Sequence, residues 1–184
     1  SGRGEMLYAA KSLGWDFAGI EASREFADFA KRTFGVDTKN CTLESAGFQK
    51  DSFDVAVLGA VIEHIYEPKE ILAEINRILK TNGILWIEVP NESSLYNLVG
   101  NLYFKLLGKN WVTQLSPAFP PYHVQGFTKS SVKALLWQTG FEVKNLRVYS
   151  GRVLLEKTGF RNYIEHCAAL FVSKIAGWFN CGTY

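Results

Sequence analysis

Apolar stretches with the length of buried strands alternate along this chain with stretches of helical period. The clearest strand pattern is FDVAVL at 53–58, a near-continuous apolar run typical of a strand covered on both faces. Further strands are predicted at 17–21, 84–89 and 141–149, with a weaker one at 41–43. This alternation predicts β-α-β units, and therefore an α/β fold with a mostly parallel sheet and helices on both faces.

Capping and stop residues mark the ends of the helical stretches. Ser23 and Thr128 are suited to begin helices, and Pro68 is suited to the first turn of another. Glycines follow the expected helix ends, because glycine readily takes the left-handed conformation found there. These glycines are Gly14, Gly35, Gly83 and Gly140. Helices are therefore expected over 5–13, 23–34 and 68–79, and between Thr128 and Gly140.

Two stretches break the alternation. The segment 91–126 is too long for an ordinary connection, and such loops in compact domains are usually lids or binding segments. The tail 151–184 contains a plausible helix over 162–179. We therefore expect a single domain over 1–184, with a lid or substrate-pocket insertion at 91–126 and a helical tail at 151–184.

The predicted lid carries an apolar helical stripe with aromatic and lysine neighbours. Such a stripe most often packs as core or lid, and we favour the lid. The alternative is an interfacial helix that makes peripheral membrane contact through 95–109, since aromatic residues beside lysines suit that boundary. The stripe consists of Leu95, Leu98, Val99, Leu102 and Leu106.

Composition narrows the classes of protein. With 184 residues, 47% of them hydrophobic and 21% charged, the chain has the size and character of one soluble globular domain. Its net charge of +2 is spread without a Lys/Arg cluster, which argues against a nucleic-acid partner. The 3 cysteines lack the short spacing of a zinc site, so no metal ligands are predicted. Reduced thiols and the lack of a leader-like or membrane-spanning pattern predict a cytoplasmic location.

The first residues have the composition of a ligand-binding turn. Gly2 and Gly4 directly precede a predicted helix, where glycines let the backbone approach a ligand at the helix N-terminus. Glu21 follows at the end of the next predicted strand, at a separation typical of a carboxylate that accepts hydrogen bonds from ribose hydroxyls. Alternatively, Glu21 is a solvated residue that caps the next helix. A dinucleotide fingerprint would require glycine or alanine where Leu7 stands, which disfavours a nicotinamide oxidoreductase.

Ordered segments give a more specific indication. SGRGE, GIEAS, CTLESAGF, SFDVAVLGAVIEHI and NRILKTNGILWIEVPN resemble the successive motifs of class I S-adenosylmethionine-dependent methyltransferases. The nearest resemblance is to the branch that includes ubiquinone-pathway O-methyltransferases and sugar or natural-product enzymes. It covers roughly 1–149 and implies a Rossmann-like fold, S-adenosylmethionine as cofactor, and methyl transfer to a small molecule, with oxygen the favoured acceptor.

The resemblance also implies cofactor-binding residues in pairs along the chain: Gly2 and Gly4, Glu21 and Ala22, Leu43 and Glu44, and Gly59 and Ala60. The first pair would line the methionine and ribose side, and Glu21 would bind the ribose hydroxyls. The third pair would lie at the adenine, although Leu43 also suits ordinary core and Glu44 ordinary surface. The last pair would pass beneath the reactive methionine moiety.

Two histidines are candidates for a catalytic base. His64 follows the predicted strand 53–58, at the sheet edge where open α/β sheets bind ligands, and His123 stands where the chain returns from the lid. A hydroxyl acceptor would gain from such a base. Structural roles are the alternatives: His64 would orient its loop or cap the next helix, and His123 would pack against the sheet.

The ends of the sequence depart from the family pattern. In the family the glycine turn follows an apolar strand, an acidic residue and a further glycine, whereas this sequence begins after them. At the other end, FNCGTY resembles the approach to the final antiparallel strand. We therefore expect a domain that lacks the first central strand and the final antiparallel strand, with sheet edges open to self-association. A non-catalytic fragment of such a domain is the rival interpretation.

Overall fold

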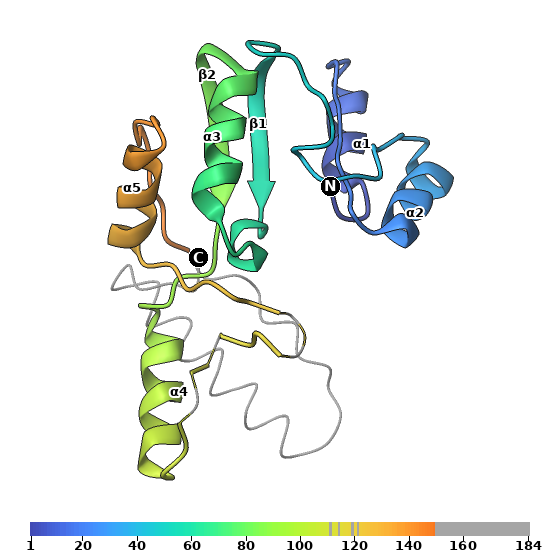
Figure 1. Cartoon of the computed structure of the whole chain (residues 1–184). Coiled ribbons are helices and arrows are strands. Elements are labelled where there is room, and N and C mark those ends of the chain that lie inside the picture. Colours follow the sequence, from blue (N-terminus) through green and yellow to red (C-terminus); the bar gives the residue numbers. More distant parts are fainter. Residues whose placement is uncertain (111, 114, 119, 121, 150–184) are drawn as a thin grey trace. The chain divides into compact units, whose positions relative to one another are not determined.

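A computed structural model of the chain describes residues 1–110, 112–113, 115–118, 120 and 122–149. The chain divides into two compact units, Ser1–Ser52 and Phe53–Tyr184, each of which is described by itself (Figure 1). The single domain with a lid at 91–126 stays a prediction, and the predicted tail at 151–184 lies outside the described residues.

The first unit contains two helices that begin and end where the capping residues predict. Helix α1 spans Glu5–Ser12, and Gly14 behind it has a φ of 73°. Helix α2 spans Arg24–Phe34; the Ser23 hydroxyl accepts a hydrogen bond from the Phe26 N–H at 3.3 Å, and Gly35 ends the helix with a φ of 61°. The helix predictions for this unit are thus confirmed.

The strand predictions for the first unit are wrong. Residues 17–21 form only an isolated parallel bridge, in which Ile20 pairs with Lys39. The segment 41–43 enters a turn, because the Ser45 hydroxyl accepts from the Thr42 N–H at 3.2 Å and competes with strand pairing. A strand requires a ladder of several hydrogen-bonded pairs, whereas residues 17–21 form a single pair, Ile20 with Lys39.

A β-α-β element forms the centre of the second unit. Strands β1 (Phe53–Gly59) and β2 (Leu79–Glu88) pair in parallel, and helix α3 (Pro68–Ile78) connects them. The regular ladder runs from Val55 opposite Ile84 to Gly59 opposite Glu88. Strand β2 starts at Leu79, earlier than the predicted 84–89, because Leu79 already pairs with Phe53. The stretch between this first pair and the regular ladder is irregular and includes Asn82, with a φ of 65°.

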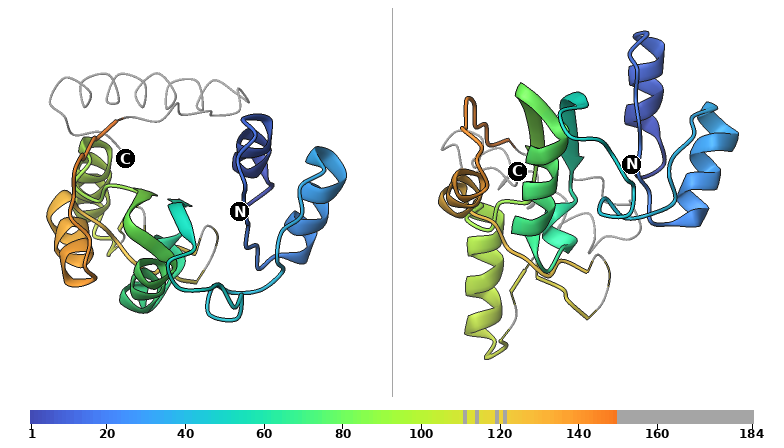
Figure 2. Two further views of the ribbon diagram at one scale, coloured as in Figure 1. Left: turned by 90° about the horizontal axis from the view of Figure 1, so that it is seen from above. Right: turned by 45° about the horizontal axis from the view of Figure 1, so that its top comes forward.

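The two faces of the β1–β2 pair differ in burial. Helix α3 lies along one face (Figure 2). Its apolar side chains Leu72, Ile75 and Ile78 are buried. The opposite face of the pair is exposed within the second unit. The strand at 53–58, which was predicted to be buried on both faces, is therefore covered on only one face by residues of this unit. We call the exposed surface the open sheet face; it consists of Val55, Val57, Ile84 and Trp86, which are 43–61% exposed. Among the described residues, β1 and β2 pair with no third strand, and self-association through their edges stays a prediction.

Two further helices follow β2. Helix α4 (Leu95–Leu106) lies in the predicted lid and begins after Ser94, whose hydroxyl accepts from the Asn97 N–H at 3.2 Å. Its apolar stripe is largely exposed, with Leu106 at 78%. Helix α5 (Lys129–Gln138) begins with a capping box at Thr128, as its sequence predicts.

The segment after α5 is not the predicted strand. Residues 141–149 have no regular secondary structure and pair with no strand among the described residues. The segment is held instead by a side chain, since the Tyr149 hydroxyl donates a hydrogen bond to the Glu88 carboxylate. No helix in the described part of the chain is both long and apolar enough to cross a membrane.

Candidate functional site

The glycine turn of the first unit combines an open position with a packed one. Gly2 has a φ of 55°, and a Cβ added there would meet no atom within 4 Å. Gly4 has a φ of 93°, and its added Cβ would lie 2.6 Å from the Cβ of Ala30 in α2. Gly2 therefore leaves room for a ligand, whereas Gly4 is required for packing against α2.

Glu21 closes this turn. Its Oε2 accepts a hydrogen bond from the Gly2 N–H at 2.7 Å and lies 3.2 Å from the Ser1 nitrogen, and its Oε1 accepts from the Ser23 N–H at 2.9 Å. The side chain is only 13% exposed. Because an ionised carboxylate offers about four acceptor positions, capacity for a ribose hydroxyl remains.

Asn40 also supports this turn, although it is not among the residues predicted from the sequence. Its Nδ2 donates to the backbone oxygens of Glu21 and Ala22 at 2.8 and 2.9 Å, which holds the segment after the bridge in place. No local sequence pattern marks such a long-range amide contact. The other predicted positions are less enclosed: Ala22 and Glu44 are exposed and Leu43 is half-buried.

The end of β1 forms a tight turn in the second unit. A Cβ added at Gly59 would have only Trp86 nearby, at an ordinary 3.5 Å, so this position is open. Ala60 has a φ of 50°, and its N–H donates to the Glu88 backbone oxygen at 3.0 Å. This left-handed residue costs roughly 1 kcal/mol and directs the chain from β1 into the short 3-10 helix η1 (Ile62–His64).

Glu63 lies in η1 with its carboxyl group buried. The residue is 2% exposed, and neither carboxylate oxygen has a hydrogen-bond partner. Desolvation by burial raises its pKa above the ordinary value. Its backbone oxygen accepts from the N–H groups of Val124 and Gln125 at 2.8 and 3.0 Å, which ties the segment after the lid to η1.

The same contacts bring the two predicted histidines together. The rings of His64 and His123 lie with their centroids 4.9 Å apart, tilted by 56°. His64 Nε2 lies 3.9 Å from Glu63 Oε1, and His64 Nδ1 lies 3.3 Å from the Tyr122 backbone oxygen. Since a carbonyl only accepts, Nδ1 is the protonated nitrogen in this contact, and in the neutral imidazole Nε2 then keeps a lone pair on the side of Glu63.

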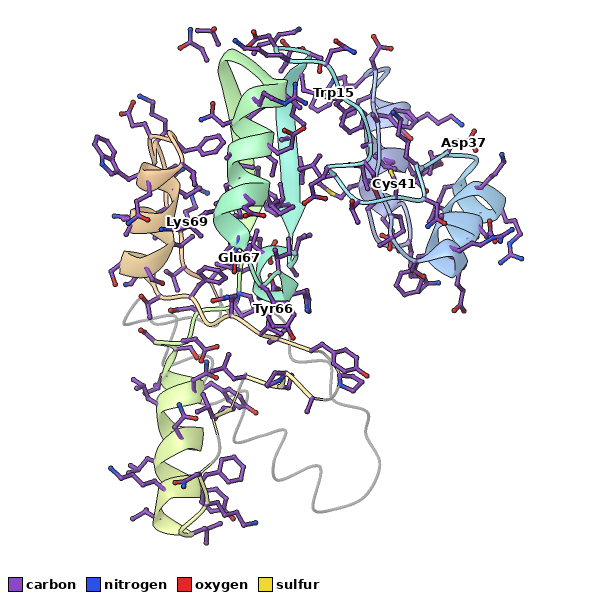
Figure 3. The ribbon with its side chains drawn as sticks, viewed as in Figure 1. Trp15, Asp37, Cys41, Tyr66, Glu67 and Lys69 are labelled. Atoms are coloured by element: carbon purple, nitrogen blue, oxygen red, sulfur yellow. The ribbon has the colours of Figure 1, made fainter. Side chains whose placement is uncertain are left out.

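Buried and polar contacts support this pair on both sides. Ser116, which is buried, donates its backbone N–H to the His123 oxygen at 3.1 Å. The Gln125 side chain donates to the Tyr66 backbone oxygen at 3.1 Å, and Figure 3 labels Tyr66 and Glu67 between η1 and α3. Glu63 and Ser116 are not among the residues predicted from the sequence, although an acidic residue between Ile62 and His64 in an apolar context is a signal for Glu63.

A glycine turn closed by a carboxylate, and a polar cluster at the carboxyl end of a parallel strand, are features of α/β domains that bind a nucleotide-like cofactor. Residues 1–146 match the model of a family described as a methyltransferase domain. The chain belongs to this methyltransferase family.

Solved methyltransferases share its fold. A SAM-dependent methyltransferase from Archaeoglobus fulgidus is 18% identical with a TM-score of 0.63, and the match covers 96% of this chain and 77% of that one. Another from Methanosarcina mazei is 21% identical with a TM-score of 0.66, covering 83% of this chain and 82% of that one. The predicted Rossmann-like class I fold is thus confirmed. S-adenosylmethionine as the cofactor follows from membership of the methyltransferase family.

Curated relatives match over shorter stretches. The arsenite methyltransferase of Rattus norvegicus is 28% identical over 75 residues, which are 36% of this chain and 20% of that protein. The mouse arsenite methyltransferase is 25% identical over 107 residues, 47% of this chain and 28% of that protein. The chain therefore spans between 20% and 28% of the length of these relatives.

Proposed function

We propose that the full-length protein transfers a methyl group from S-adenosylmethionine to an oxygen atom of a small molecule. The observation that supports an oxygen acceptor is the pair of rings of His64 and His123, whose centroids lie 4.9 Å apart. His64 follows the turn at Gly59 and Ala60 in the sequence. A hydroxyl must lose a proton to become an ether, and an imidazole is well suited to take it. A cytoplasmic location, expected from the reduced cysteines, belongs to the same proposal.

The cofactor roles of single residues are part of this proposal. In the first unit, the open space at Gly2 and the acceptor capacity left on Glu21 fit a ribose hydroxyl. In the second unit, the open position at Gly59 leaves room for a methionine group. Gly4 supports the turn through its packing. Ala22, Leu43 and Glu44 would contribute along the ribose and adenine, and Ala60 would lie beneath the methionine group.

Bound S-adenosylmethionine supplies a methyl group on a sulfonium, which is already reactive. The chain has to hold an acceptor oxygen in line with that methyl group and keep water away. His64 Nε2, whose lone pair is unprotonated when Nδ1 donates to the Tyr122 oxygen, would receive the acceptor proton. His123 beside it would orient the acceptor or share this role.

The lid supplies the acceptor pocket in this proposal. Helix α4 presents exposed apolar side chains such as Leu98 and Leu102, at 57% and 58%, which suit an apolar acceptor. Peripheral membrane contact through 95–109 is the alternative use of the same residues.

Calorimetric titration of the full-length protein with S-adenosylhomocysteine tests the cofactor. Labelled methyl transfer to a panel of sugars, quinols, phenols and, because of the curated relatives, arsenite tests the acceptor. The variants His64→Asn and His123→Asn should each slow transfer to an oxygen acceptor by about 10²-fold or more. They should bind S-adenosylhomocysteine normally, and the exposed Glu67→Gln serves as the control variant.

Folded protein that gives no heat with S-adenosylhomocysteine would overturn the proposal. Cofactor binding without transfer to any acceptor would favour the non-catalytic interpretation. If the protein transferred the methyl group only to arsenite, or if both histidine variants kept full activity, the proposal of an oxygen acceptor would be overturned.

A further inference from the structure

Glu63, His64 and His123 form a compact group of donor atoms at the carboxyl end of β1. One ligand atom from each residue lies within 4.8 Å of the others. We propose that this Glu63/His64/His123 cluster binds a divalent transition-metal ion of the Zn²⁺ type. The inference deepens the proposed methyl transfer, on which its catalytic meaning rests, and replaces the base role given to His64 above: in the metal-bound protein the ion, not an imidazole, activates the acceptor hydroxyl.

The donor set determines the class of ion. Two imidazole nitrogens and one carboxylate oxygen are the protein ligands of many catalytic zinc sites and of non-haem iron(II) sites. Mg²⁺ and Ca²⁺ prefer all-oxygen surroundings and would gain little from two imidazoles. The cluster therefore favours Zn²⁺, Co²⁺ or Fe²⁺ over the alkaline-earth ions.

The burial of Glu63 is the second, independent observation. A carboxyl group that is 2% exposed and accepts no hydrogen bond is costly to keep ionised. Its ion-pair partner is the His64 imidazole at 3.9 Å, which is charged only when protonated. A divalent cation between these side chains would stabilise the carboxylate and use both imidazoles in their neutral form.

The surroundings of His64 match those of a metal-binding histidine. Such residues usually donate the second ring N–H to a backbone carbonyl or carboxylate, which fixes the tautomer and the ring orientation. His64 Nδ1 lies 3.3 Å from the Tyr122 oxygen, so that Nε2 points its lone pair into the cluster. Tyr122 has a φ of 61°, an uncommon conformation that directs this carbonyl.

The cluster has to contract to hold an ion. Ligands of a tetrahedral Zn²⁺ at about 2.1 Å lie about 3.4 Å from one another, so the separations of up to 4.8 Å must shorten. His64 is partly exposed and His123 lies in an irregular segment, so rotation of these side chains can supply the movement. Glu63 is the fixed member, because η1 and its two backbone contacts to Val124 and Gln125 hold it.

Three protein ligands leave an open coordination position. An acceptor hydroxyl bound there would have a lowered pKa and would release its proton to water before methyl transfer. In the metal-bound protein the imidazoles therefore hold the ion and do not themselves take the proton. Cysteine spacing alone predicts no metal ligands in this sequence, whereas the ligands of this cluster come from two segments far apart along the chain.

Direct metal binding tests this inference apart from activity. Full-length protein freed of metal by a chelator is titrated with Zn²⁺ by calorimetry, with and without saturating S-adenosylhomocysteine, and with Co²⁺ by visible absorption. We expect one ion per chain and Co²⁺ bands typical of four or five nitrogen and oxygen ligands. His64→Asn, His123→Asn and Glu63→Gln should each weaken Zn²⁺ binding by roughly 100-fold or more.

The exposed acid Glu67 and the free thiol Cys41 give the matched controls Glu67→Gln and Cys41→Ser, which should bind Zn²⁺ as the parent does. Because Glu63→Gln alters a buried group, circular dichroism checks its fold, and the two histidine variants carry the test if it unfolds. The inference would be overturned if the protein bound no Zn²⁺, or if the His64→Asn/His123→Asn double variant bound Zn²⁺ as the parent does. In either case, normal binding of S-adenosylhomocysteine would leave the proposed function standing. Zn²⁺ binding lost in the variants of a protein that binds no S-adenosylhomocysteine would support the metal site and overturn the proposed function.

Discussion

Glu21 in the first unit and Glu63 in the second each lie just beyond a strand-like segment. Their carboxyl groups nevertheless differ in whether they accept hydrogen bonds. Glu21 accepts hydrogen bonds from the Gly2 and Ser23 N–H groups. Glu63 is more deeply buried and accepts none. The comparison teaches that the fold of the first unit uses the Glu21 carboxylate for its own stability, whereas the second unit buries the Glu63 carboxyl group without a hydrogen bond to it.

The turn that Glu21 closes should be the more sensitive of the two regions. Gly4→Ala should lower the free energy of unfolding of the first unit by about 2–4 kcal/mol, because the added Cβ meets Ala30 and the backbone φ is positive. Gly2→Ala, whose added Cβ meets nothing, should cost only about 1 kcal/mol. Chemical denaturation of both variants measures the difference, and equal losses would show that packing against α2 is not what Gly4 provides.

Glu21→Gln should have the next largest effect. The amide keeps the shape but places an NH₂ group against backbone N–H donors, so about 1–3 kcal/mol of unfolding free energy should be lost. S-adenosylhomocysteine affinity, measured by calorimetry, should fall as well if the remaining acceptor capacity binds the ribose. A variant with normal stability and weakened affinity would mean that Glu21 contributes to the ligand alone.

Glu63→Gln should have the smallest effect and can have the opposite sign. In metal-free protein it removes a buried group that tends to carry unpaired charge, so the free energy of unfolding should change by less than about 1 kcal/mol or rise. Thermal and denaturant unfolding beside the exposed control Glu67→Gln measures this change. A loss as large as that of Glu21→Gln would contradict the contrast between the two carboxyl groups.

Helices were predictable from the sequence where caps and apolar stripes act locally. The Ser23 and Thr128 hydroxyls and the Gly35 backbone form the same short-range contacts that their positions predict. Strands were predictable only where a partner exists: 53–58 pairs with β2, whereas 141–149 pairs with no strand among the described residues. Apolar alternation describes a surface that suits a sheet, but the ladder depends on distant residues.

The candidate site divides in the same manner. Gly2, Glu21 and His64 carry local signals, a glycine before a helix or a polar residue after a strand. Asn40 and Ser116 act through contacts with residues far along the chain, so their roles depend on tertiary structure. The proximity of His123 to His64 arises because the segment after the lid is hydrogen-bonded to the Glu63 backbone oxygen.

The left-handed backbone at Ala60 sets limits on which amino acids a library of random variants can retain there. Glycine, asparagine and aspartate adopt this conformation most readily, whereas valine and isoleucine are strongly disfavoured. Selection for methyl transfer should therefore enrich the first three types at position 60 and deplete the β-branched ones. That substitution profile would record the backbone geometry of the turn after β1 independently of any bound ligand.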